Sequence, residues 1–141
     1  MPTNLSKVAT ERGIKYFLIS FVDLFGILRS KLVPARAIAG MQKDGAGFAG
    51  FAAWLDMTPA DSDMFSIPDP DSLIQLPWKP EVGWLAGDLV MDGNAVEASP
   101  RVALKQQIGR AEIRGFRMKT GVECEYFLVS ADGSSRSDVN D

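Results

Sequence analysis

The sequence lacks histidine altogether and contains a single cysteine, Cys124. Without histidine, the 141 residues hold no Ser/His/Asp triad, no Cys/His pair and no histidine-based zinc site. One cysteine excludes an internal disulfide framework and is compatible with a reducing cytoplasm. Any catalytic chemistry of these residues would therefore use carboxylates, lysine, arginine or the backbone.

Long apolar runs and an excess of positive charge are absent as well. No apolar run approaches the roughly 18 to 20 residues that span a bilayer, and residues 1–10 lack the apolar core of a signal peptide. The net charge is −3 with the two signs interspersed, so nothing favours a nucleic-acid partner. With 46% hydrophobic and 23% charged residues, the chain is expected to be a soluble, globular, cytoplasmic protein.

The first 42 residues predict a helix, a hairpin and a second helix. Residues 3–12 have a helical apolar face that ends at Gly13. A nearly continuous apolar run over residues 15–22 is typical of a central strand buried on both faces. The turn residues 23–26 join it to a second strand over residues 27–33, and Pro34 opens a short helix over residues 35–42.

Two middle segments leave alternatives open. Residues 45–54 are glycine, alanine and aromatic residues without charge, so they either let backbone approach a ligand or form an apolar packing loop, which their composition favours. Residues 57–71 contain several Asp and Pro residues that could imitate a calcium loop. Because the central Gly and terminal Glu of an EF-hand are missing, we expect a solvent-facing structural loop there.

The remaining elements complete an α+β pattern with a mostly antiparallel sheet. We expect a short strand over residues 73–76, a hairpin over residues 83–97 that turns at Asp92-Gly93, and a helix from Ser99-Pro100 to Gly115. This organisation predicts one unit over residues 1–97 and the incomplete beginning of a second over residues 98–141. The chain is therefore expected to be a fragment of a longer protein.

Residues 121–129 read as a strand, because β-branched and aromatic residues alternate with a period of two. Glu123 and Glu125 then share one face, roughly 7 Å apart along the backbone. Such a pair could face a cluster of hard cations. The alternative is a pair of solvent-facing glutamates on an edge strand.

Four motifs in register resemble the N-terminal third of the glutamine synthetase family. They are Val22-Asp23-x-x-Gly26-x-x-Arg29-x-Lys31-x-x-Pro34, then Ser62-Asp63-Met64 with Pro68-Asp69, then Pro100-Arg101-x-x-Leu104, and finally Gly121-x-Glu123-x-Glu125-Tyr126-Phe127-Leu128. Residues 45–50 and 104–108 further resemble the branch with type III-like synthetases and γ-glutamylmethylamide synthetases.

The resemblance implies an N-terminal β-grasp domain followed by the first helix and strand of the catalytic domain. It implies an enzyme that uses ATP to phosphorylate the γ-carboxylate of glutamate, after which ammonia or an amine displaces the phosphate. Mg²⁺ or Mn²⁺ ions take part, and Glu123 and Glu125 carry over as ligands of two different ions. Family members form homo-oligomeric rings. The other metal ligands and the ATP-binding residues belong to later parts of the family's chain, so no catalytic residue is assigned here.

One departure from the family concerns the amine. Many relatives place an Asp before Gly-Ser-Ser in a loop that helps to bind ammonium, whereas Phe48-Ala49-Gly50-Phe51 has alanine at that position. An apolar lining would suit methylamine, since burying a methyl group gains roughly 0.8 kcal/mol. The alternatives are therefore methylamide formation on the same fold and, in a different class, a non-catalytic oligomerisation or binding module.

Several single residues have structural interpretations. We expect Asp23 to serve its turn, and Arg29 and Arg101 to fix the domain through carboxylate or backbone contacts rather than to bind phosphate. Cys124 is expected to be a small core residue and not a nucleophile. The three tryptophans are expected in the core or at an interface: Trp54, Trp78 and Trp84.

Overall fold

A computed structural model describes residues 3–53, 57–133 and 136–137. The first half of the chain forms α1 (Leu5–Arg12), β1 (Tyr16–Val22), β2 (Leu28–Pro34), η1 (Ala35–Ala37), α2 (Ile38–Asp44), β3 (Ala46–Phe48) and η2 (Gly50–Ala53). The second half forms β4 (Met64–Pro68), η3 (Pro70–Ser72), β5 (Ile74–Gln75), β6 (Val82–Met91), β7 (Asn94–Ala95), α3 (Pro100–Ile113), β8 (Leu128–Val129) and β9 (Arg136–Ser137). Trp54 lies outside the described residues.

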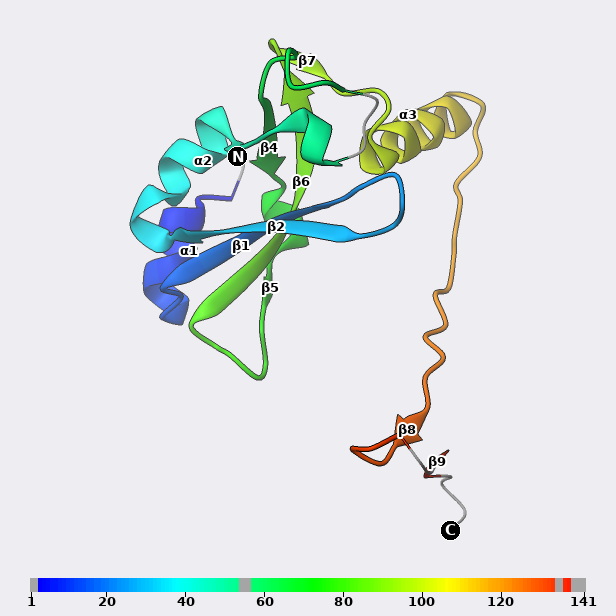
Figure 1. The fold of residues 1–141 in the computed structure, drawn as a ribbon. Coiled ribbons are helices and arrows are strands. Elements are labelled where there is room, and N and C mark those ends of the chain that lie inside the picture. Colours follow the sequence, from blue (N-terminus) through cyan, green and yellow to red (C-terminus); the bar gives the residue numbers. More distant parts are fainter. Residues whose placement is uncertain (1–2, 54–56, 134–135, 138–141) are drawn as a thin grey trace.

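The ten-residue strand β6 is the centre of the sheet. Its first half runs parallel to β1 and its second half antiparallel to β4, which gives the strand order β2-β1-β6-β4-β3. Every other pairing in this sheet is antiparallel. Figure 1 shows β6 crossing from the β1–β2 side to the β4 side. The mostly antiparallel sheet expected from the sequence is confirmed.

Both hairpins form where the turn residues predicted them. β1 pairs with β2 in full register from Tyr16 opposite Pro34 to Val22 opposite Leu28. The β6–β7 turn places Asp92 at φ 49° and Gly93 at φ 77°, the left-handed backbone that a two-residue hairpin loop with matching twist requires.

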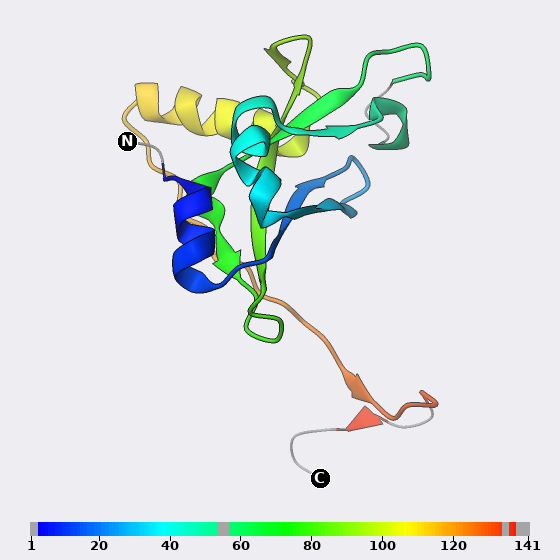
Figure 2. The same ribbon diagram turned by 90° about the vertical axis from the view of Figure 1, so that its left-hand side faces the viewer.

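One face of the sheet is covered by α1 and α2, which carry Leu5, Ala9 and Ile38 into the core. These side chains meet Phe17, Ile19 and Leu85 from β1 and β6, all of which are buried. A second cluster lies farther along the same strands, where Phe21 and Leu89 meet Ala53 of η2. Figure 2 shows both helices on this side, with α3 on the opposite side of the sheet.

The predicted helices are correct in position, with one change. Asn4 caps α1 by accepting a hydrogen bond from the Lys7 N–H, and Gly13 ends it at φ 68°. The helix expected over residues 35–42 begins instead as the 3₁₀ turn η1 and continues as α2. α3 begins at Pro100 as expected, although the Ser99 hydroxyl makes no capping hydrogen bond. Within the described residues, no helix is long and apolar enough to cross a membrane.

The expectation of a solvent-facing loop over residues 57–71 is wrong for β4. This strand lies inside the sheet between β6 and β3, with Met64 and Ser66 completely buried. Its inward side chains alternate, but the set includes a serine and a proline, so the apolar pattern of a buried strand is too weak to recognise in the sequence.

The expected strand over residues 121–129 is wrong for most of its length, because only Leu128–Val129 pairs, with β9. Residues 121–127 are exposed and outside any helix or strand. Figure 1 shows this segment running away from the sheet after α3. A strand needs a neighbouring strand for its backbone hydrogen bonds, and the described residues offer none beside 121–127.

Asp23 organises the turn between β1 and β2, as its position in the sequence predicted. Its buried carboxylate accepts hydrogen bonds from the N–H groups of Phe25 and Ile27, each at 2.9 Å, and from Arg29 Nε at 2.8 Å. Gly26 completes the turn at φ 79°. Burial by itself raises the pKa of the Asp23 carboxyl, but the hydrogen bonds from Ile27, Arg29 and Phe25 together hold this pKa below its usual value of 3.8.

Gly83 has no room for a side chain, which gives a first prediction. A Cβ on Gly83 would lie 3.0 Å from Phe17 Cε1 and 3.0 Å from Leu73 Cδ1, whereas a Cβ on Gly40 of α2 meets nothing within 4 Å. We expect Gly83→Ala to lower the free energy of unfolding by about 1–3 kcal/mol through overpacking. Gly40→Ala should raise it by about 0.5–1 kcal/mol, since alanine favours the helix. Urea unfolding of both variants checks the prediction, and equal effects of the two would contradict the packing described.

The lowered pKa of Asp23 predicts a pH-dependent contribution to stability. A group whose pKa is lowered by folding stabilises the protein fully above its unfolded pKa and loses this contribution as the pH falls through the folded value. The difference in unfolding free energy between wild type and Asp23→Asn should therefore be largest above about pH 4 and shrink below it. The exposed Asp44→Asn is the control and should show little difference at any pH. A difference for Asp23→Asn that is independent of pH would contradict the bonding of this turn.

Candidate functional site

A small pocket lies beside the uncharged segment that follows α2. It has a volume of about 220 Å³ and is lined by Phe21, Arg29, Ser30, Phe48, Ala49, Ala52 and Ala53. Five of these side chains are apolar. The guanidinium of Arg29 is half-buried and already paired with the Asp23 carboxylate at 2.8 Å. The pocket can therefore accept a small, partly apolar group without leaving a new unpaired charge.

Two contacts fix the aromatic wall of this pocket. The rings of Phe21 and Phe48 meet edge to face, with their centroids 4.9 Å apart. On the exposed side, Lys31 Nζ lies 5.0 Å from the centroid of Phe48 and donates a hydrogen bond to the Gly47 carbonyl. The hairpin β1–β2 thus holds β3 and the start of η2 in place, a packing role that agrees with the preferred interpretation of residues 45–54.

Four charged side chains attach α3 to the sheet. Arg101 Nε donates to Asp88 Oδ1 at 2.9 Å, and Arg101 Nη2 donates to Asp69 Oδ2. Lys105 Nζ donates to Asp88 Oδ2 and lies 3.7 Å from Asp69 Oδ2. We name these residues the α3 clamp. The expectation that Arg29 and Arg101 contact carboxylates or backbone rather than phosphate agrees with these ion pairs, while the contribution of Lys105 was not foreseen.

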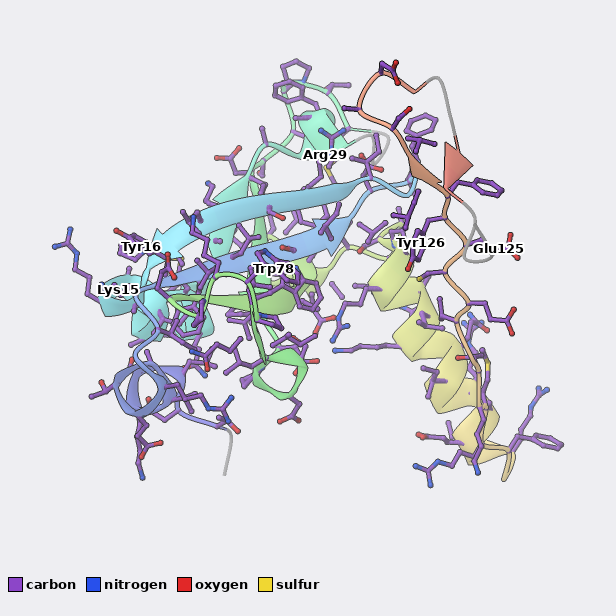
Figure 3. All side chains as sticks on the ribbon, turned by 90° about the horizontal axis from the view of Figure 1, so that it is seen from below. Lys15, Tyr16, Arg29, Trp78, Glu125 and Tyr126 are labelled. Atoms are coloured by element: carbon purple, nitrogen blue, oxygen red, sulfur yellow. The ribbon has the colours of Figure 1, made fainter. Side chains whose placement is uncertain are left out.

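The predicted metal ligands lie on the extended segment that follows the α3 clamp. Glu123 and Glu125 are exposed, and Figure 3 shows Glu125 and Tyr126 on this segment. Among the described residues, no three Cys, Asp or Glu side chains lie close enough to hold a metal ion together. Their assignment as ligands therefore stays a prediction.

The positions expected for Cys124 and for two of the tryptophans can be compared with the structure. Cys124 is exposed, so the prediction of a core position is wrong; its segment has no layer of structure to pack against within the described residues. Trp78 is 80% exposed and is not a core residue, whereas Trp84 is half-buried on β6.

Lys31, Lys105 and the pocket are the features that reasoning from the sequence missed. The regular spacing Arg29-x-Lys31 on β2 places both cations on one face of a strand, which was the available signal for Lys31. For Lys105, the signal was its separation of four residues from Arg101 on one face of α3. The pocket had no such signal, because its lining comes from three separate segments.

The sequence and fold of this chain both match known proteins, although no family model matches it. The chain is 60% identical over all 141 residues to a glutamine synthetase of Rhizobium leguminosarum bv. phaseoli and spans 32% of that protein. It is 38% identical over 130 residues to a glutamate–methylamine ligase of Methyloversatilis universalis, covering 91% of this chain and 29% of that one.

Solved structures that resemble this chain point to the same family as these relatives. The structure described as "Apo GmaS without ligand" matches 99% of this chain and 33% of its own, with a TM-score of 0.92 and 60% identity. A GmaS/ADP complex matches with the same TM-score and identity. This likeness confirms the α+β fold class with a β-grasp N-terminal domain. The chain spans about a third of the length of its relatives, and it corresponds, in sequence and in fold, to the N-terminal third of the glutamine synthetase family.

Proposed function

We propose that this chain forms the N-terminal part of an ATP-dependent ligase that amidates the γ-carboxylate of glutamate through γ-glutamyl phosphate. The observation that carries the proposal is the 60% identity over all 141 residues with the glutamine synthetase of Rhizobium leguminosarum. Glutamate, ATP and ammonia or a small amine are then its substrates. A homo-oligomeric ring and a cytoplasmic location are further parts of this proposal.

The proposal divides the chain at residue 97. Residues 1–97 contain the whole sheet from β1 to β7 together with α1 and α2, and so form the β-grasp domain. Residues 98–141 begin the catalytic domain with α3 and the glutamate segment. In support of this division, the sheet ends at Ala95, and α3 follows it as a separate helix attached through the α3 clamp and the buried Val102.

Glu123 and Glu125 are the proposed ligands of two neighbouring Mg²⁺ or Mn²⁺ ions. Their carboxylates suit such ions, which prefer hard oxygen donors. Both side chains are exposed and make no ion pair within the described residues, so they are available for a cation. Bound divalent ions would neutralise the negative charge that phosphoryl transfer concentrates on oxygen atoms. The remaining ligands of each ion would come from other parts of the proposed enzyme.

In this proposal, the residues of this chain position the metal ligands and the amine, and they do not transfer protons. The α3 clamp fixes the helix from which the glutamate segment extends. The pocket beside Ala49 offers an apolar surface to a small amine, and the Asp23–Arg29 pair keeps its polar edge neutral. We assign no general base among these residues, and the carboxylates of Asp23 and Asp61 are engaged in the hydrogen bonds of turns.

A chimera tests the proposed role of the two glutamates. Residues 1–141 replace the matching third of the Rhizobium leguminosarum relative, and formation of amide from glutamate, ATP and ammonia is measured with Mg²⁺. We expect an active chimera, and a loss of about 10²-fold or more in kcat for Glu123→Gln and for Glu125→Gln, since each removes a charge that stabilises the transition state. The isolated chain should form no amide.

Two glutamates elsewhere serve as matched controls for this experiment. Glu97→Gln and Glu112→Gln remove the same charge from exposed positions and should leave the activity of the chimera unchanged. Size-exclusion chromatography shows that each variant assembles as the parent does. Full activity of both Glu123→Gln and Glu125→Gln, or amide formation by the isolated chain, would contradict the proposal.

Methylamine is a second candidate for the amine substrate. The observation that favours it is the alanine lining of the 220 Å³ pocket, which Ala49, Ala52 and Ala53 form. The similarity to a glutamate–methylamine ligase and to GmaS supports the same candidate. Buried methyl groups favour an apolar surface, whereas a carboxylate would favour ammonium.

The preference between the two amines is tested by Ala49→Asp in the chimera. We expect kcat/KM for methylamine relative to ammonia to fall by about fourfold, which corresponds to about 0.8 kcal/mol for one methyl group. Ala39→Asp introduces the same charge on the exposed side of α2 and should leave the ratio unchanged. An unchanged ratio for Ala49→Asp as well would exclude the pocket as the determinant of amine preference.

A further inference from the structure

A lysine joins the two edge strands of the sheet, β2 and β3. The strand order β2-β1-β6-β4-β3 includes no backbone pairing between β2 and β3 in the part of the chain that the structure describes. Lys31 of β2 nevertheless reaches across, because its Nζ donates a hydrogen bond to the Gly47 carbonyl of β3 and lies 5.0 Å from the centroid of the Phe48 ring. One side chain therefore connects two strands that the backbone hydrogen bonds do not connect.

The register of β2 explains why Lys31 can reach β3. Residues directly opposite each other on antiparallel strands place their side chains on the same face. Lys31 lies opposite Ile19, which is completely buried, and Val33 lies opposite the buried Phe17. Lys31 therefore occupies an inward position of an edge strand, where an antiparallel sheet usually has an apolar residue.

The pocket beside Ala49 lies at the same opening between the edge strands. Arg29 and Ser30 of β2 form one side of its lining, and residues 48–53 supply Phe48 and three alanines on the other. Figure 2 shows the hairpin β1–β2 next to η2. The width of the pocket is the separation of these two sides, so a contact that fixes β2 relative to Phe48 also fixes this width.

Phe48 is held on several sides, and Lys31 holds it on the exposed one. Its ring packs against both apolar clusters of the core and meets the Phe21 ring edge to face. Lys31 adds the contact from β2. Because Lys31 is not among the residues that line the pocket, its influence on a bound molecule passes through Phe48.

Protection of the sheet edge accounts for only part of this arrangement. An inward-pointing charge on an edge strand hinders pairing with a strand of another molecule. That role requires a charge but no fixed position for it, whereas Lys31 is held by both a carbonyl group and an aromatic ring. Lys31 forms no ion pair within the described residues, so these two contacts are the ones that place its ammonium group.

We propose that Lys31 is a positioning residue for the amine substrate, and that it acts by fixing Phe48 and thereby the width of the pocket beside Ala49. The inference rests on the proposed function, in which this pocket receives a small amine. With the Lys31 contacts in place, both sides of the pocket pack against a short alkyl group. Without them, β2 and Phe48 can separate, which weakens the packing of a methyl group and admits a longer chain.

Amide formation by the chimera with methylamine and with n-propylamine tests this proposal. Lys31→Met keeps an unbranched side chain and removes the charge. We expect it to lower the ratio of kcat/KM for methylamine to kcat/KM for n-propylamine by about two- to fivefold, as loss of an exposed cation–π contact would. The change should lie in KM for the amine, with kcat and the KM values for glutamate and ATP unchanged. Lys31→Arg retains a cation and a donor and should keep the ratio of the unsubstituted chimera.

A double-mutant cycle tests whether Lys31 acts through Phe48. Phe48→Leu removes the aromatic ring, so Lys31→Met should have little further effect on the amine ratio in that background. Effects of the two substitutions that simply add would overturn the proposed route.

Two control variants separate the role of Lys31 from general effects of charge and stability. Lys79→Met removes an exposed lysine, between β5 and β6, that forms no ion pair among the described residues. Gly83→Ala is expected to destabilise the sheet beside Phe17 and Leu73, neither of which lines the pocket. Both controls should leave the amine ratio unchanged.

The possible failures are distinguishable. An active chimera in which Lys31→Met leaves the amine ratio unchanged, or in which either control changes it equally, would overturn this inference and leave the proposed function standing. No amide from any amine by the unsubstituted chimera would overturn the proposed function and this inference with it.

Discussion

A network of four charged side chains and one buried apolar residue attach α3 to the sheet. Val102 is the one buried residue of the helix, while Leu104 is 50% exposed and Ile108 is 39% exposed. Asp69 and Asp88 meet Arg101 and Lys105 in the α3 clamp, where the four side chains are between 23% and 49% exposed. An isolated pair at such exposure contributes about 0–1 kcal/mol, but a network of four charges with a paired guanidinium holds its geometry better than single pairs do.

The clamp links the scaffold to the residues that carry the proposed chemistry. Asp88 belongs to β6, the strand that both halves of the sheet share, and Asp69 is fixed because its N–H donates to the Ala86 carbonyl at 2.8 Å. The direction in which the chain leaves the sheet is therefore set by β6. Glu123 and Glu125 lie on the extended segment after α3, which ends at Ile113, so the clamp fixes the helix from which this segment departs. The Asp23–Arg29 ion pair likewise fixes Arg29, which lines the pocket beside Ala49.

Local sequence signals predicted the elements whose determinants are local. Gly13, Asp23, Gly26 and the Asp92-Gly93 pair each specify a helix end or a turn through their own backbone preferences, and all four appear where expected. The β4 strand was missed because Ser66 and Pro68 occupy inward positions, where burial is decided by β6 and β3 rather than by hydrophobicity. The alternation over residues 121–129 indicated a strand. A strand also needs a neighbouring strand for its hydrogen bonds, and the alternation carries no information about whether such a neighbour is present.

The central claim is that Glu123 and Glu125 each bind a different divalent ion in a complete enzyme. Anomalous diffraction at the manganese edge, from crystals of the chimera grown with Mn²⁺ and ADP, tests it most directly. The account predicts two manganese peaks, one within coordination distance of each carboxylate, close to the roughly 2.0–2.1 Å of Mg²⁺–oxygen bonds. Manganese bound elsewhere in the active site, with both carboxylates facing solvent, would contradict it.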